Sequence, residues 1–509
     1  MSRLALLPIA TTVVFVGLAQ AQTPKEPKDP KAKPAVSASA SASSPTPTGP
    51  SANDTPVPLP QIPLGSGPPL TADEAAKRAV ATSKQAKVDE AKVKAAAAAV
   101  DQAFVGYFPR LTIQASYTRL SPVDPVSLGS DQAYSVAVAK TPGVNPGAPL
   151  PTGAILVASP SFSFPVLLNQ YSLSATLVVP ISDYVFRIYD NHKSALASQE
   201  AAKWTSKVNE VNTAADARVA FYNVLRARGT VVIAKSAVAQ AESHLKDLKV
   251  RLELKAVTTA DVSQVEASRA GAELAVIKAE NLVTITETNL RMLMHSPDDE
   301  AFSLGEDLMV EIPKYTGDLK TLKADAASRR PELKAIDAQI ASIESTSNVV
   351  SAGLYPRLDG VAQLLTANPN QRVFPLQEKF MTTWSLGLQL TWSPNDTMVA
   401  SAQKKTISAS TEQLKATREQ VTDALILDVT NAFVKVREAD ASVVSTLAEL
   451  RAAEDTLRVR KEQFQLGGIT STILTDAEAD VTRARLNHLN ARVELRIARA
   501  QLKKATGEV

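Results

Sequence analysis

Few side chains in this sequence are spaced for catalysis or metal binding. No H-E-x-x-H motif, phosphate-binding loop or nucleophile elbow is present. The absence of cysteine excludes disulfides, thiolate metal sites, cysteine nucleophiles and a lipidated N-terminal cysteine. An acidic run at 298–300 follows Pro297 and is typical of a solvated linker. We therefore predict no enzyme, no metal and no cofactor. The histidines lie far apart, at His192, His244, His295 and His488.

More informative are two glycines that interrupt a stretch with helical character. Residues 395–466 contain neither glycine nor proline, and Gly467 and Gly468 follow at once. Such a pair can end a long helix and reverse the chain. A hydroxyl side chain at 470–472 can then cap the returning helix. The first half turns at 254–262 without glycine, so we expect its turn to have a different shape.

Composition and the N-terminal segments limit the class of protein. The chain has 509 residues, 55 Lys+Arg and 52 Asp+Glu, with the two signs interleaved. This indicates solvated helices, not nucleic-acid binding. Residues 1–21 have the pattern of a signal peptide, and 22–69 form a Pro/Ala/Ser-rich leader that we expect to be disordered. No later stretch is apolar for long enough to span a membrane as a helix, so any membrane insertion would use β-strands.

The chain repeats itself. The segment 104–117 and the segment 351–364 both carry aromatic-Pro-Arg-Leu before an alternating stretch. Phe221 matches Phe433, an offset of 433 − 221 = 212 residues, and Glu266 matches Glu478 at the same offset. The sequence therefore predicts two structural repeats. They cover 70–296 and 318–509, and residues 297–317 link them.

Each repeat contains two stretches of strict alternation. In 383–392 one face is apolar and begins and ends with tryptophan, and 171–180 repeats the pattern. Segments of about 9–11 residues with apolar outer faces and aromatic ends are typical of membrane β-barrels. A soluble half-buried sheet alternates in the same way. The candidate lipid-facing aromatic residues are Tyr117, Tyr171, Trp384 and Trp392.

The number of strands has a consequence for assembly. Four strands per chain cannot close a barrel, because the smallest membrane barrels have about eight. An open strand edge is not tolerated in lipid, so copies of the chain must share one barrel. Two copies would supply eight strands and three would supply twelve.

The final helix carries two apolar stripes at heptad spacing. Two stripes indicate packing on two sides, which suits a helix within a ring of helices, although a soluble bundle with a wide apolar face is the alternative. The first stripe is Leu474, Ala477, Val481, Ala484, His488, Ala491, Leu495, Ala498 and Leu502. The second is Leu486, Leu489, Val493, Ile497 and Ala500.

These features together resemble the TolC-like outer membrane efflux protein family. The resemblance covers about residues 70–508 and is most specific in "GLYPRL" and "FQLGGITSTILTDAEA". It implies a mainly helical homotrimer with a shared 12-stranded outer-membrane barrel, four strands per chain, and a long periplasmic α-helical barrel. It also implies a passive efflux or type I secretion channel in a Gram-negative outer membrane. Its partners would be outer-membrane lipid, a periplasmic adaptor and an inner-membrane pump.

In that family, acidic residues just after the hairpin tips surround a narrow entrance. The matching positions here are Asp261 at the first tip and Asp476 at the second. Gly467 and Gly468 are further candidates at the second tip. Ile473 occupies the position that corresponds to Asp261, so the acidic ring is expected to be weaker than usual. A first-turn carboxylate that complements the helix dipole explains either aspartate equally well.

Two other classes of protein share some of these features. A secreted coiled-coil stalk or scaffold would have the long helices and the leader, and a periplasmic adaptor would have helical hairpins. Neither requires alternating strands bounded by tryptophan.

Overall fold

The computed structural model describes most of the chain after the leader. The described residues are 67–123, 127–128, 134–137, 155–158, 162–163, 166–297, 301–308 and 310–508. The predicted signal peptide, nearly all of the leader and the acidic run at 298–300 lie outside them.

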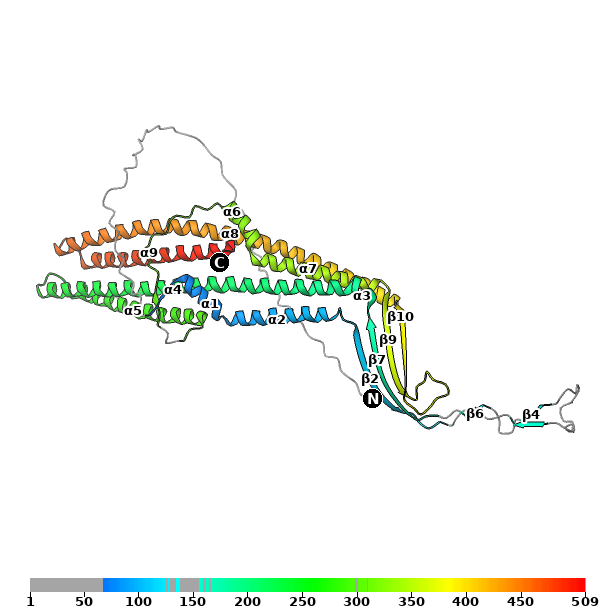
Figure 1. The fold of residues 1–509 in the computed structure, drawn as a ribbon. Coiled ribbons are helices and arrows are strands. Elements are labelled where there is room, and N and C mark those ends of the chain that lie inside the picture. Colours follow the sequence, from blue (N-terminus) through cyan, green and yellow to red (C-terminus); the bar gives the residue numbers. More distant parts are fainter. Residues whose placement is uncertain are drawn as a thin grey trace, which may run out of the picture. The chain divides into compact units, whose positions relative to one another are not determined.

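Four long strands form one antiparallel sheet in the order β10-β9-β7-β2 (Figure 1). Their alternating apolar and polar side chains predict this extended structure. The sheet joins the two repeats, because β7 of the first pairs with β9 of the second. The strands are β2 (Arg110–Arg119), β7 (Asn169–Val179), β9 (Arg357–Asn368) and β10 (Met381–Thr391).

Short strand pairs accompany the main sheet. β1 (Pro69–Leu70) pairs in parallel with β8 (Ser303–Leu304) and thereby connects the start of the first repeat to the linker. The two remaining pairs lie in the segment between β2 and β7. They are β3 (Ser127–Leu128) with β6 (Phe162–Ser163), and β4 (Tyr134–Ala137) with β5 (Ile155–Ala158).

Two very long helices follow the strands, and each packs against a shorter returning helix. The helix α4 (Tyr189–Glu253) pairs with α5 (Thr259–Met294), and α8 (Pro394–Gln465) pairs with α9 (Ser471–Thr506). The prediction of a long helix from 395 is confirmed, since α8 has 72 residues. No helix among the described residues is long and apolar enough to cross a membrane.

The other helices begin each repeat or connect strand to helix. α1 (Ala72–Thr82) and α2 (Lys84–Val105) precede β2, and α6 (Leu319–Arg329) and α7 (Pro331–Ser351) precede β9. A short α3 (Ile181–Asp183) and a π-helix (Tyr184–Ile188) lead from β7 into α4, and a 3₁₀ turn (Ala352–Leu354) leads from α7 toward β9.

The buried side chains lie mainly between the long helices. One cluster joins α1, α4, α5 and α9 around Phe221, and a second joins α6, α8 and α9 around Val436. All nine residues of the first predicted stripe on α9 are buried. In the second stripe Leu486 is partly buried and the other four are buried. The heptad pattern therefore identified both packing faces of α9.

Candidate functional site

The four-stranded sheet has one apolar face. Residues paired across antiparallel strands point to the same side of a sheet, so the register assigns every side chain to a face. The four apolar side chains that β10 contributes to this face are 69–76% exposed, although they are large. Polar residues on this side, such as Thr366 and Thr382, lie toward the loop end. Its other members are Leu111, Ile113, Ala115, Tyr117, Tyr171, Leu173, Ala175, Leu177, Val179, Leu358, Gly360, Ala362, Leu364, Trp384, Leu386, Leu388 and Leu390.

The opposite face is mostly polar, with Val361 and Leu365 among its exceptions. Arg372, in the loop after β9, donates hydrogen bonds to Gln363 Oε1 at 3.0 Å and Ser385 Oγ at 3.3 Å on this face. Its other polar members include Thr112, Gln114, Ser116, Thr118, Ser172, Ser174, Thr176, Asp359, Thr383, Gln389 and Thr391. Such a sheet can separate lipid on one side from water on the other.

Aromatic side chains lie at both ends of the apolar face. Tyr117 and Tyr171 are directly paired at the loop end, with ring centroids 4.9 Å apart, and Phe380 lies 6.1 Å from Tyr171. Trp384 is on the same face near that end, and Trp392 follows the last residue of β10 at the helix end. Phe380 was not among the predicted aromatics, because it precedes the alternating stretch.

Further exposed aromatics at the helix end were also missed by sequence reasoning. Phe186, in the π-helix, stacks on Tyr355, with ring centroids 5.5 Å apart. Both rings are largely exposed, as is Phe108 before β2. Their signal is weak in the sequence because they belong to short connecting segments without a period.

The second hairpin turns at the two predicted glycines. Gly467 lies one residue beyond the C-cap of α8 and takes a left-handed φ of 77°. Its amide donates to Phe464 O at 3.0 Å, and the amide of Gly468 donates to Gln463 O at 2.8 Å. This is the Schellman arrangement that satisfies the last carbonyls of a helix. Thr470 is the N-cap residue of α9, but it makes no side-chain capping hydrogen bond, contrary to the prediction for 470–472.

The first hairpin has the same turn, and the prediction of a different shape is wrong. Lys255 takes the left-handed conformation there, with φ 57°. Its amide donates to Leu252 O at 2.9 Å, and the amide of Ala256 donates to Arg251 O at 2.9 Å. A lysine therefore takes the place of glycine here, in a backbone conformation that is unfavourable for residues with a Cβ. Chain reversal depends on these carbonyl contacts, which a lysine amide makes as well as a glycine amide.

The two candidate entrance aspartates have different surroundings. Asp261 is the third residue of α5 and forms a capping box with Thr258. Its Oδ2 accepts the Thr258 hydroxyl at 2.7 Å and the Thr258 amide at 2.9 Å, and these bonds lower the pKa of Asp261. Asp476 is exposed on α9, and Ile473 occupies the position equivalent to Asp261. Only Asp261 therefore has a helix-capping role.

A buried histidine connects the ends of the two hairpins. His244 of α4 places Nδ1 3.2 Å from Glu478 Oε2 and Nε2 3.4 Å from Ser471 Oγ, both on α9. Nearby, Arg251 donates to Gln465 O at 3.1 Å, and its guanidinium lies 4.6 Å from the ring centre of Phe464. Sequence spacing could not identify these contacts, because the partners are more than 200 residues apart.

His488 lies inside the second hairpin, as its position on the heptad stripe predicts. Its Nδ1 is 3.1 Å from the hydroxyl of Thr446 on α8. Burial, together with the charge of Arg492, lowers the pKa of His488 to about 4. The imidazole is therefore neutral at ordinary pH. Among the described residues, no three His, Asp or Glu side chains are grouped so that they could hold a metal ion.

The second repeat and the whole fold both have known counterparts. Residues 322–508 match the family model described as outer membrane efflux protein. The outer-membrane channel OprN is similar in structure, with 19% identity, a TM-score of 0.67, and coverage of 86% of this chain and 90% of that one. The CmeC channel of Campylobacter jejuni is 13% identical, with TM-score 0.67 and coverage of 86% and 85%. The MtrE channel of Neisseria gonorrhoeae is 14% identical, with TM-score 0.66 and coverage of 86% and 88%.

A search of curated protein sequences found no match. The fold is that of the TolC-like outer-membrane channels, as the resemblance in the sequence predicted. The match to the outer membrane efflux protein model is confined to residues 322–508, which span most of the second repeat.

Proposed function

We propose that the protein is the outer-membrane channel of an efflux or type I secretion system in a Gram-negative bacterium. One observation carries this proposal: an apolar face, largely exposed on β10, extends over all four strands and has a mostly polar face behind it. Exposed to water, such a face would favour aggregation, whereas lipid accommodates it. A coiled-coil stalk has no use for this face. The matched family and the similar channels support the same function.

The two edges of the sheet support a shared barrel. β2 and β10 are the edge strands, and they run in opposite directions because every neighbouring pair is antiparallel. β10 of one copy can therefore pair with β2 of the next and continue the same pattern. Unpaired backbone groups at these edges are costly in lipid, so closure through several copies is favoured. Three copies, as the family resemblance implies, give a barrel of twelve strands.

The long hairpins then form a periplasmic tunnel whose entrance lies at their tips. Asp261 and Asp476 would surround this entrance, and Gly467 and Gly468 would shape the turn beside it. A periplasmic adaptor and an inner-membrane pump would bind at the tips. The channel itself would be a passive conduit without catalysis, cofactor or metal.

We propose that the chain has a signal peptide, a leader and two repeats joined by a linker. Residues 1–21 are a signal peptide and 22–69 a leader. Residues 70–296 and 318–509 are the two repeats, connected by 297–317.

The native mass of the protein from the outer-membrane fraction tests this function. The protein should require detergent for extraction and should have a mass near three chains after correction for bound detergent. Reconstituted into planar bilayers, it should conduct ions. A water-soluble monomer or dimer would refute the shared barrel and leave the stalk as the better interpretation.

A further inference from the structure

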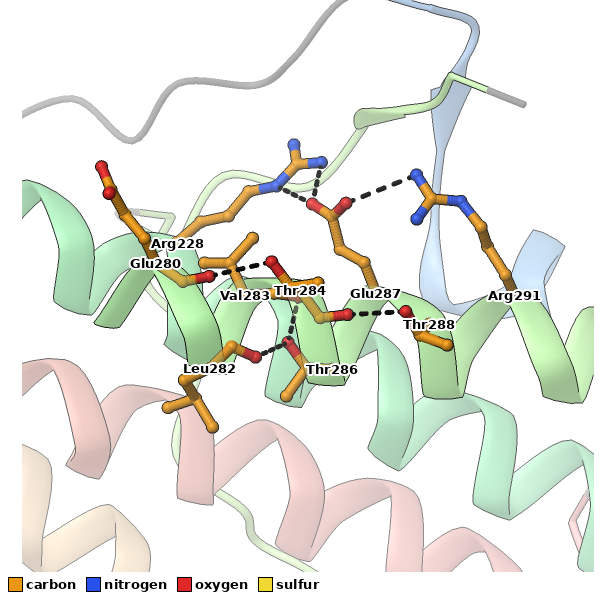
Figure 2. A network of polar contacts seen from close by, with 9 residues as sticks. All are labelled: Arg228, Glu280, Leu282, Val283, Thr284, Thr286, Glu287, Thr288 and Arg291. Carbon is orange, nitrogen blue, oxygen red and sulfur yellow. Dashed lines mark hydrogen bonds and ion pairs between the residues drawn. The ribbon is translucent and has the colours of Figure 1, made fainter. Parts of the chain in front are cut away.

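Ion pairs join α4 to α5 along the first hairpin, and all have the same polarity. Arg228 lies 2.6 Å from Glu287, Lys235 lies 2.8 Å from Glu280, and Lys249 lies 3.5 Å from Glu266. The basic residues are all on α4 and the acidic residues all on α5, at positions separated by seven residues or a multiple of seven. Figure 2 shows Glu287 between Arg228 of α4 and Arg291 of its own helix.

The second hairpin also has ion pairs between its two helices, but their polarity is reversed, and one of them is at positions equivalent to a pair of the first hairpin. Asp440 of α8 lies 3.4 Å from Arg499 of α9, and Glu454 of α8 lies 2.8 Å from Arg485 of α9. The offset of 212 residues places Asp440 at the position of Arg228 and Arg499 at the position of Glu287. The acid is now on the long helix and the base on the returning helix.

The side chains of these two equivalent pairs are largely shielded from water. The side chains of Arg228 and Glu287 are 14% and 16% exposed, and those of Arg499 and Asp440 are 22% and 11% exposed. Low exposure strengthens both attraction and repulsion, because solvent screens the charges less. A wrong partner at this position would therefore be penalised more than at an exposed position.

The pattern does not extend to the tips. Glu478 is equivalent to Glu266, but it contacts His244 of α4 instead of α8. Glu273, which lies between Glu266 and Glu280 at the same spacing, pairs with Arg269 on its own helix. The reversal is therefore a property of the part of each hairpin nearer the linker.

We infer that the opposite polarity of the two hairpins selects which helices pair. In the native chain α4 also contacts α9, where Arg226 lies 2.6 Å from Glu494, but Arg226 is on nearly the opposite side of α4 from Arg228. The returning helices have 36 residues each and the turns match, so the face of α4 that carries Arg228 could otherwise pair with a returning helix of the α9 type, and α8 with one of the α5 type. Such exchanged pairs would place Arg228 opposite Arg499 and Asp440 opposite Glu287. Both combinations bring like charges together in a poorly solvated position. The same rule applies within one chain and between two copies, and charge patterns select coiled-coil partners in this way.

Charge exchange distinguishes partner selection from simple ion-pair stabilisation. The variant R228E/E287R keeps an ion pair in the first hairpin but gives both hairpins the same polarity. The variant R228E/E287R/D440R/R499D reverses both hairpins and so restores their opposition. Each is expressed as the full chain, and the distribution of native mass is measured in detergent together with the thermal unfolding midpoint.

We expect R228E/E287R to give several native masses, with the main wild-type species reduced several-fold. The fourfold variant should recover the single wild-type mass, although it carries more substitutions. The exchange D440R/R499D alone should broaden the distribution as R228E/E287R does, which keeps the test decisive if the fourfold variant folds poorly. The contacts of Arg228 with the ring of Phe302 are lost in both R228E/E287R and the fourfold variant, so they cannot explain a difference between them.

The control E90K/K94E exchanges an exposed pair within α2 and should leave the mass unchanged. If both double exchanges give one native mass like the wild type, partner selection by charge is refuted. The readout is homogeneity of mass, so the result does not depend on whether the protein conducts or forms a trimer.

Discussion

Lys255 and Gly467 have the same backbone conformation at equivalent positions of the two repeats. Both are left-handed, with φ 57° and 77°, and both lie one residue beyond the C-cap of a long helix. In each case the amide of the next residue donates to a carbonyl five residues back. A side chain with a Cβ costs roughly 1–2 kcal/mol in this conformation, whereas glycine adopts it freely.

Exchanging these residues should shift stability in opposite directions. Lys255→Gly should raise the free energy of unfolding by up to about 1 kcal/mol, after the added flexibility of the unfolded chain is subtracted. Gly467→Ala should lower it by about 1 kcal/mol. A Cβ at Gly467 would meet no atom within 4 Å, so this loss would come from the backbone alone. Denaturant unfolding of the detergent-extracted protein measures both.

Gly468→Ala is the matched control for the turn. Gly468 has no left-handed φ, and a Cβ there would make only ordinary contact, 3.5 Å from Gln463 O. The change should have little effect. An equal loss at Gly467 and Gly468 would show that the left-handed conformation does not determine the cost.

Substitutions of the two tip aspartates can separate the effect of helix capping from the effect of charge at the entrance. The double change Asp261→Asn with Asp476→Asn removes both charges but leaves an oxygen acceptor for the amide of Thr258. If the aspartates surround the entrance, this variant should be less blocked by multivalent cations in planar-bilayer conductance. Unchanged block would contradict the proposed entrance.

Alanine substitutions test the structural role of the same residues. Asp261→Ala should cost about 1 kcal/mol, because it removes the capping box with Thr258. Asp476→Ala should be nearly neutral, because Asp476 is exposed and has no comparable position in the first turn of α9. Thermal unfolding of the two single variants measures this difference.

Neighbouring residues on β10 test the orientation of the sheet. Leu388 is on the apolar face and Gln389 on the polar face. Leu388→Arg should prevent or strongly reduce membrane insertion, since an arginine facing the middle of the bilayer costs about 2–4 kcal/mol. Gln389→Arg should be tolerated. Recovery of each variant in the outer-membrane fraction provides the comparison, and equal recovery would contradict the assigned lipid face.

Acid should destabilise the second hairpin through His488. Burial lowers its pKa to about 4 in the folded protein, whereas an unfolded histidine has a pKa of about 6.5. Between these values the unfolded chain binds the extra proton. Stability is therefore complete above about pH 6.5 and falls as the pH approaches 4, by on the order of 3 kcal/mol.

His488→Gln should flatten this pH dependence when unfolding is compared between about pH 7 and pH 5. His192→Gln removes a histidine near the ring of Tyr107 and serves as the control. If His488→Gln leaves the acid sensitivity unchanged, the sensitivity originates elsewhere in the protein.

Local sequence patterns predicted the regular elements but not the contacts between them. The alternation in 383–392 and the heptads of α9 identified faces correctly, because each pattern repeats over many residues. The left-handed conformation of Lys255 was missed because a residue other than glycine can adopt it, and nothing in the sequence signals this. The contact of His244 with Glu478 was missed because it depends on how α4 packs against α9, which no spacing within one helix records.

The returning helices end as the long helices do, and the residues again differ between the repeats. His295 after α5 has φ 50°, and Gly507 at the equivalent position after α9 has φ 77°. In the first hairpin, residues with a Cβ therefore take the left-handed conformation after both helices, at Lys255 and His295. In the second hairpin, glycine takes it after both helices, at Gly467 and Gly507. The first hairpin should therefore open locally more often, and its terminal amides should exchange with solvent sooner. In a ring of several copies, compliant and firm tips would then alternate around the central axis.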